Sequence, residues 1–290
     1  MQDSMPFIIR RIVTQNSLPS SVQERIEFAI DCLTKACEDI SESVTVLQTP
    51  GGFLFNCLDL RTIKTGINST IPHFNIVVDK VEQFMRNFLT RDLIQIILPK
   101  ADFVTFGVDI FDSVGICDYD SRRNRKNFEK HVELVGTFDT KQQKFTHWTG
   151  KSYPVDFQED TLLYCGDLES HFQYFGQTRV LVLGCHDLNI FSPRSRKSSK
   201  QGTYKGKLIS QMQKKCDEFK PQVVLHHPHT TDSSRIWATA WSGVSKFIPF
   251  AKIYSSGIHY KNIKGGAQRQ PLNKVLPATA LGNIENTIIN

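Results

Sequence analysis

Short apolar segments alternate with amphipathic ones along this chain, and this alternation restricts it to sheets covered by helices. The clearest helix is predicted over 22–40, where apolar residues recur at helical spacing on one stripe. Ser21 and Glu24 have the spacing of a capping box, which places the start of that helix. Short apolar runs predict strands over 7–13, 44–47, 103–108, 179–183 and 223–225.

The remaining segments extend the same pattern. Two strands of a hairpin are predicted over 132–138 and 143–148. Further predictions are strands over 161–164, 252–260 and 287–289, helices within 77–98, 207–219 and 235–247, and a polar loop over 118–130. The expected fold is α/β, a sandwich of two sheets with helices on both outer faces. No Pro/Gly-rich linker and no repeat divides the sequence, so a single domain over 1–290 is predicted.

The composition is that of a globular protein, with 40% hydrophobic and 22% charged residues, which excludes a disordered chain. The net charge of +6 is concentrated between Arg194 and Lys215, where eight Lys/Arg occur without Asp or Glu. We interpret 194–206 as a solvated basic loop insertion. With Tyr204 as its one aromatic residue, the basic segment does not have the interleaved aromatics of a nucleic-acid site, so no nucleic-acid partner is expected.

The seven cysteines are scattered and form no CxxC pair, which argues against a disulfide framework and against a zinc cluster. The first residues do not have the pattern of a signal peptide, and no run approaches 18 apolar residues. A reducing, cytoplasmic location without membrane association is therefore predicted.

Two positions have the sequence context of catalytic residues. Cys185 follows a buried strand and a glycine, which is how a nucleophile at a strand-to-helix elbow is presented to a pocket and to backbone N–H groups. Lys151 closes the predicted hairpin, where an ammonium group can stabilise an oxyanion. The alternatives are a structural buried cysteine and a solvated lysine.

A set of histidines allows a different interpretation. His226, His227 and His229 follow one strand, and His186 and Asp187 follow another, so together they could bind a metal. The pair Gly166-Asp167 with 184–187 faintly resembles metallophosphoesterase motifs, but no Asp-x-His stands near the N-terminus. A metal-dependent phosphoesterase is kept as the third hypothesis, and no metal site is expected.

Taken in order, these segments resemble the nitrilase (carbon–nitrogen hydrolase) superfamily. The residues Pro50-Gly51-Gly52-Phe53 stand where the family has a Pro-Glu-Gly-Phe motif. The hairpin from Thr137 to Lys151 resembles the one that ends at the family's catalytic lysine, and Gly184-Cys185-His186-Asp187 resembles its nucleophile elbow. Lys151 and Cys185 are 34 residues apart, close to the family's interval.

The resemblance implies a four-layer α-β-β-α sandwich and a hydrolase of the amidase or nitrilase type. Cys185 would attack an amide or nitrile carbon to give a thioester or thioimidate, with Lys151 stabilising the oxyanion. The resemblance also implies a homo-oligomer, and it implies no metal or organic cofactor. The pocket candidates are His186, Asp187, Phe53, His227 and Trp237.

The sequence departs from the family at Gly51, which stands at the position of the general-base Glu. Without a carboxylate the Cys185 thiol would keep a pKa near ~8.5, and hydrolysis would be slow or absent. His186 is the nearest substitute but is expected to point away, and the carboxylates to examine first are Asp109, Asp112 and Asp187. The first hypothesis is therefore a hydrolase with an altered base, and the second is an inactive nitrilase-like protein that acts through binding or assembly.

Overall fold

The computed structural model describes residues 6–15, 17–113, 130–155, 158–193, 195, 199–200, 202–230, 234–261, 263–264 and 267–289. At 234–237, 263–264 and 267–268 it describes the backbone alone. Nearly all of the loop predicted over 118–130, and parts of the basic loop predicted over 194–206, lie outside the described residues.

The larger sheet runs in the order β11-β1-β2-β4-β5-β6, with β15 paired to β1 and β3 paired to β4. Its strands are β1 (Ile9–Gln15), β2 (Val44–Gln48), β3 (Leu54–Leu58), β4 (Ala101–Asp112), β5 (His131–Asp139), β6 (Lys144–Gly150), β11 (Ile258–Tyr260) and β15 (Ile284–Ile289). Parallel pairing of β1, β2 and β4 gives way to antiparallel pairing at β4, β5 and β6.

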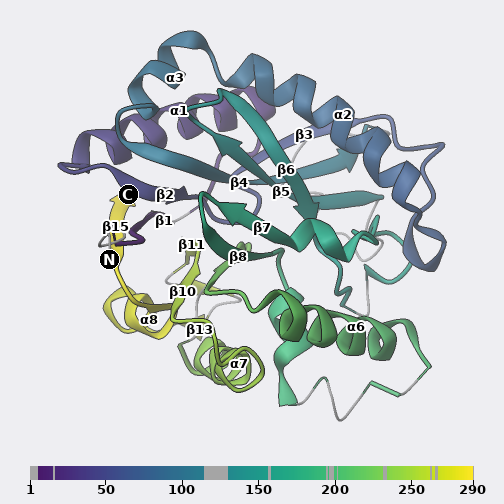
Figure 1. The fold of residues 1–290 in the computed structure, drawn as a ribbon. Coiled ribbons are helices and arrows are strands. Elements are labelled where there is room, and N and C mark those ends of the chain that lie inside the picture. Colours follow the sequence, from purple (N-terminus) through teal and green to yellow (C-terminus); the bar gives the residue numbers. More distant parts are fainter. Residues whose placement is uncertain are drawn as a thin grey trace.

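The second sheet runs in the order β14-β10-β9-β8-β7 and faces the first (Figure 1). Its strands are β7 (Phe172–Phe175), β8 (Thr178–Leu183), β9 (Val223–His226), β10 (Ile253–Ser256) and β14 (Ala280–Leu281), and a short ribbon pairs β12 (Ile263–Lys264) with β13 (Ala267–Gln268). Aliphatic side chains fill the space between the two sheets, among them Ile9, Val46, Val180 and Leu225.

Helices cover both outer faces, which makes four layers (Figure 1). The helices α1 (Val22–Asp39), α2 (Ile71–Phe88) and α3 (Arg91–Ile97) pack on the larger sheet, where Leu33, Val81 and Phe106 share one core cluster. The second sheet is covered by α6 (Tyr204–Phe219) and α7 (Ser234–Phe247), and a short helix α8 (Leu272–Ala278) packs beside β11. The predicted α-β-β-α sandwich is confirmed.

The capping box predicted for α1 forms as expected. The Ser21 hydroxyl accepts from the Glu24 N–H at 3.3 Å and donates to the Glu24 carboxylate at 2.7 Å. Such a cap stabilises a helix by about 1 kcal/mol. The predicted strand over 287–289 is the end of β15, and it pairs parallel with β1.

Three local predictions differ from the structure. The helix predicted within 77–98 is two helices, because Thr90 caps a new start with its hydroxyl. The segment 161–164 forms a single bridge from Leu162 to His131 instead of a strand. The strand predicted over 252–260 is split at Gly257, so that β10 lies in one sheet and β11 in the other. A Cβ at Gly257 would lie 2.5 Å from the Thr49 carbonyl oxygen, so this close crossing requires glycine.

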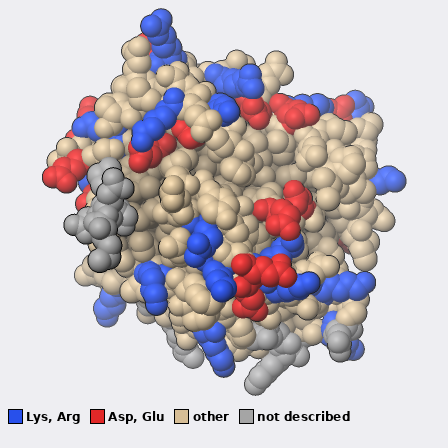
Figure 2. All heavy atoms as spheres, viewed as in Figure 1, with Lys and Arg blue, Asp and Glu red and all other residues tan. Residues whose placement is uncertain are grey.

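On the face drawn in Figure 2, basic side chains over α6 are interspersed with acidic ones instead of forming a continuous patch. Lys205 pairs with Glu159 at 2.7 Å, and Lys215 pairs with Glu169. Among the described residues, the helices are all too short or too polar to cross a membrane.

Candidate active site

The elbow after β8 places Cys185 at a turn between a buried strand and the short 3-10 helix η4 (Asp187–Phe191). His186 has a φ of 62°, in the left-handed region, so the backbone reverses sharply directly after the cysteine. The Asp187 carboxylate accepts the Gly184 N–H at 3.0 Å and holds the turn closed. The Cys185 side chain is 5% exposed.

Lys151 follows β6, and its ammonium group lies beside the elbow, in contact with His186. Its Nζ is 3.2 Å from Glu133 Oε1, 2.5 Å from Gln158 Oε1 and 3.1 Å from His186 Nδ1. An ammonium group has three donors, and these three acceptors use all of them. The Lys151 side chain is therefore held in one position although it is buried.

The carboxylate of Glu133 comes from the middle of β5. Asp109 on β4 is its register partner, so the two carboxylates lie on the same face of the sheet. Glu133 Oε1 also accepts from Gln158 Nε2 at 2.9 Å, while Oε2 lies 3.4 Å from His229 Nδ1. His229 Nε2 is 2.8 Å from both oxygens of Asp109. The imidazole between the two carboxylates offsets their repulsion.

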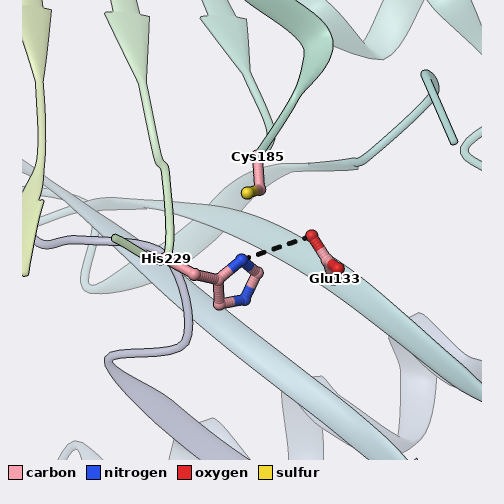
Figure 3. A group of neighbouring side chains, drawn as sticks. All are labelled: Glu133, Cys185 and His229. Atoms are coloured by element: carbon pink, nitrogen blue, oxygen red, sulfur yellow. Dashed lines mark ion pairs between the residues drawn. The ribbon is translucent and has the colours of Figure 1, made fainter. Parts of the chain in front are cut away.

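Figure 3 shows that Glu133, Cys185 and His229 point toward one another from β5, from the end of β8 and from the segment after β9. One donor atom from each of the three lies within 4.8 Å of the other two. Cys185 Sγ is also 3.2 Å from His186 Nδ1. The thiol is thus surrounded by two imidazoles, a carboxylate and, through His186, the ammonium group of Lys151.

The electrostatics favour a thiolate. Burial raises the pKa of Cys185, but the neighbouring His186 and His229 outweigh burial and the Glu133 charge and bring the pKa well below the usual value of a thiol. Burial also raises the pKa of Glu133, and the surrounding Lys151 and histidines outweigh it, so this pKa lies below the usual range. The same surroundings therefore favour both the thiolate of Cys185 and the carboxylate of Glu133.

A narrow cavity lies beside the thiol, and in this arrangement it is too tight to hold a water molecule. Glycines, two apolar residues and the polar and charged groups around the thiol line this cavity. The lining residues are Gly51, Gly52, Asp109, Glu133, Leu134, Val135, Gly184, Cys185, His227 and His229. A substrate therefore reaches the thiol only when the neighbouring side chains move apart.

No family model and no curated protein match the sequence. The whole structure, however, matches solved amidases. A serine variant of the Nesterenkonia AN1 amidase from the nitrilase superfamily superposes with a TM-score of 0.55 at 10% identity, over 91% of this chain and 82% of that chain.

The chain has the nitrilase-superfamily fold. A second match is a variant of the Nesterenkonia amidase with acrylamide added at its active-site cysteine, with a TM-score of 0.53, 11% identity and coverage of 90% and 81% of the two chains. A third is an alanine variant of that amidase with butyramide, at a TM-score of 0.53, 10% identity and coverage of 91% and 80%. At 10–11% sequence identity these matches show a shared fold and no more. The chemistry of this nitrilase-like chain has to be argued from its own residues.

Several sequence-predicted site residues come together in this nitrilase-like fold. Cys185 and Lys151 lie close together, because both side chains contact His186 Nδ1. The expectation that His186 points away was wrong, because the left-handed backbone at this residue turns the ring back over the thiol. His227 lines the cavity, and burial lowers its pKa to about 3, so it is neutral.

Other candidates lie elsewhere. Asp187 does not face the cavity, since its Oδ1 accepts the N–H groups of Ser152 at 2.9 Å and Tyr153 at 2.7 Å. Phe53 is fully buried in the core under α1 and α2. Asp112 accepts the Leu60 N–H at 3.2 Å. The side chain of Trp237 lies outside the described residues.

Gly51 lines the cavity but leaves no vacant space for a side chain. A Cβ on Gly51 would lie 2.4 Å from the His227 carbonyl oxygen, and the Gly51 N–H donates to the Pro228 carbonyl at 3.0 Å. A Glu side chain at this position is therefore sterically blocked. The backbone after β9 occupies the space that a side chain would need.

Sequence reasoning missed Glu133 and Gln158. Glu133 has a signal in the sequence, since it is a charged residue in the middle of an otherwise apolar run over 132–138. A buried carboxylate of this kind needs a partner, which is an indication of function. Of the proposed metal-binding histidines, His226 is hydrogen-bonded to Ser256 at 3.1 Å, and His229 joins the site.

Proposed function

We propose that this chain is a carbon–nitrogen hydrolase that cleaves a small amide or nitrile, with Cys185 as nucleophile and Glu133 as the carboxylate that replaces the missing general base. The observation that supports it most is the position of Glu133. Its side chain contacts Lys151 at 3.2 Å and lies beside Cys185, although it comes from β5 and not from the segment after β2.

The first step is attack by the Cys185 thiolate on the amide carbon, which forms a C–S bond and moves the carbonyl electrons onto oxygen. His186 Nδ1, 3.2 Å from Sγ, takes the thiol proton. That protonation ends the acceptor role of Nδ1 toward Lys151, so one Lys151 N–H becomes available for the oxyanion. The backbone N–H of His186 is the second donor, because it directly follows the nucleophile.

The intermediate collapses when the C–N bond breaks. The leaving nitrogen takes the proton held by His186, and the acyl group remains on Cys185 as a thioester. Glu133 then removes a proton from water, and the resulting hydroxide attacks the thioester carbon. The carboxylic acid leaves as the C–S bond breaks, and the proton on Glu133 passes to Cys185 Sγ, which restores the thiol and the Glu133 carboxylate. A nitrile would follow the same course through a thioimidate.

The charged groups that line the cavity support a polar substrate. A single domain over 1–290, a homo-oligomer and a cytoplasmic location complete the proposal, as the family resemblance and the scattered cysteines imply. A basic loop insertion at 194–206 remains part of this prediction.

The test is ammonia release from a panel of small amides and nitriles, including acetamide, acrylamide and butyramide. We expect turnover by the parent and by Cys57→Ser, a control on β3, and no turnover by Cys185→Ala. A well-folded parent that neither releases ammonia nor reacts with acrylamide at Cys185 would contradict the proposal and favour an inactive binding or assembly protein.

A further inference from the structure

We propose that Cys185, His229 and Glu133 form a Zn²⁺ site, and that zinc is a reversible inhibitor of the hydrolase. The inhibitory part rests on the proposed function, because the metal would occupy the nucleophile and the base. The binding part rests on the three side chains alone, which Figure 3 shows converging on one point.

The distances suit a metal ion. The three donor atoms, one each from sulfur, nitrogen and oxygen ligands, lie within 4.8 Å of one another. Zinc bonds of about 2.0–2.3 Å in a tetrahedral arrangement place ligand atoms roughly 3.3–3.8 Å apart. A closure of about 1 Å, within the reach of side-chain rotation, would complete three of the four positions.

Groups around the three ligands already orient them. Both Asp109 oxygens lie 2.8 Å from His229 Nε2, which directs the other ring nitrogen toward Glu133. Lys151 and Gln158 hold Glu133 Oε1, so that Oε2 is the oxygen on the His229 side. A carboxylate behind a histidine ligand is the usual arrangement at zinc sites.

The ligand types select the metal. A thiolate sulfur and an imidazole favour zinc over Mg²⁺ and Ca²⁺, which prefer oxygen ligands. The nearby Lys151 ammonium, 3.2 Å from Glu133, opposes a cation. The site should therefore release its metal to a chelator, unlike a structural zinc centre.

Inhibition follows from the identity of the ligands. A thiolate bonded to zinc cannot attack an amide carbon, and a carboxylate bonded to zinc cannot accept a proton from water. Zinc would also separate Cys185 from His186, whose Nδ1 is 3.2 Å from the thiol sulfur in the metal-free arrangement.

The experiment measures binding without substrate. The purified full chain is treated with a chelator, titrated with zinc chloride and analysed for bound metal after dialysis. Cobalt chloride is used in parallel, because a thiolate on Co²⁺ gives a near-ultraviolet charge-transfer band. We expect one metal per chain, loss of the cobalt band in Cys185→Ser, and binding weakened by about 10–100-fold in Asp109→Asn. Cys57→Ser, on β3, should bind like the parent.

A second measurement uses the unmutated chain, so that misfolded variants cannot obscure the result. Zinc should block acrylamide labelling of Cys185, and a chelator should restore the labelling rate. Absence of bound zinc, or binding unchanged in both Cys185→Ser and the acrylamide-labelled parent, would overturn the site. Faster amide hydrolysis with zinc would overturn the inhibitory role. Zinc binding without any amide turnover would refute the proposed function and leave the metal site intact.

Discussion

Within the described part of the chain, two buried cysteines lie beside histidines, and the two pairs differ in what surrounds them. Cys185 lies beside His186 and His229 at the cavity, whereas Cys165 lies beside His171 within the core cluster of the larger sheet. Burial raises the pKa of both thiols, and in both the neighbouring histidines reverse the effect, so both pKa values are lowered. A lowered thiol pKa therefore does not identify the nucleophile.

What distinguishes Cys185 is its place at the cavity together with a second set of charges. Its neighbours include the Glu133 carboxylate, and the cavity reaches the sulfur. Cys165 instead contacts the hydroxyls of Ser170 at 3.3 Å and Thr149 at 3.7 Å and is fully buried. The first pair can react with a substrate, and the second can serve as a support.

The second pair supports the strand end that carries Lys151. The Ser152 hydroxyl donates to the Cys165 carbonyl at 2.6 Å and lies 2.9 Å from His171 Nε2. The Ser152 N–H donates to Asp187, which also holds the elbow of Cys185. Substitutions at Cys185 are therefore expected to change the chemistry, and substitutions at Cys165 are expected to change the position of Lys151.

The largest difference is expected between alanine variants of the two cysteines. Cys185→Ala removes the nucleophile and should lower kcat by at least about 10⁴-fold. Cys165→Ala should keep kcat within about tenfold while losing stability, because it removes a buried side chain that contacts Ser170 and Thr149. Ammonia release and denaturant unfolding measure the two effects. Equal losses of kcat in both variants would remove the distinction.

Glu133→Gln comes next in size. Loss of the base should lower kcat by about 10²–10⁴-fold, with deacylation as the slow step. Asp139→Asn, on the same strand, is the matched control and should change kcat little. A Glu133→Gln variant with parental kcat would exclude this carboxylate as the base.

Asp187→Asn should have a smaller, positional effect. The carboxylate accepts three backbone N–H groups, from Gly184, Ser152 and Tyr153, and an amide cannot accept all of them. We expect a loss of about 1–3 kcal/mol in unfolding free energy. Because Asp187 holds both the elbow of Cys185 and the segment after Lys151, both should loosen together in this variant. We therefore expect kcat to fall by more than KM rises. Unchanged stability would show that Asp187 is not the clamp.

The smallest effect is a change in protonation at the second pair. Burial alone would lower the pKa of His171, but the hydrogen bond and charge of Cys165 and the charge of Asp187 raise it to about 9. His171 is therefore protonated at pH 7.5 in the parent. In Cys165→Ser the burial effect should bring the pKa below that pH and leave the ring neutral. An NMR titration of His171 measures this, and an unchanged pKa would contradict the pairing.

The parts of the site that sequence predicted are those with a local signature. Cys185 and Lys151 each follow a strand and lie at the edge of a sheet, and this context is visible in a few residues. Glu133 is placed by its register with Asp109, and His229 by the segment after β9, so both depend on long-range pairing. The inward turn of His186 depends on a left-handed backbone conformation that its sequence does not reveal.

In the fold, too, features with a local sequence pattern were predictable, and features that depend on distant contacts were not. Strands such as β2 and β8 and the helix α1 were predictable because their apolar patterns are local. The change of sheet at Gly257 was not, since it depends on contact with Thr49 far away in the sequence. The tight packing of Gly51 was equally hidden, since a Cβ there would lie 2.4 Å from the carbonyl oxygen of His227, far away in the sequence.

The most direct test of the central claim is to trap the acyl group. Glu133→Gln is incubated with a small amide at neutral pH, quenched in acid and digested for mass spectrometry. We expect an acyl adduct on the peptide that contains Cys185, none on the peptide with Cys165, and no adduct in Cys185→Ala. An unmodified Cys185 under conditions where the parent releases ammonia, or an adduct on another cysteine, would contradict it.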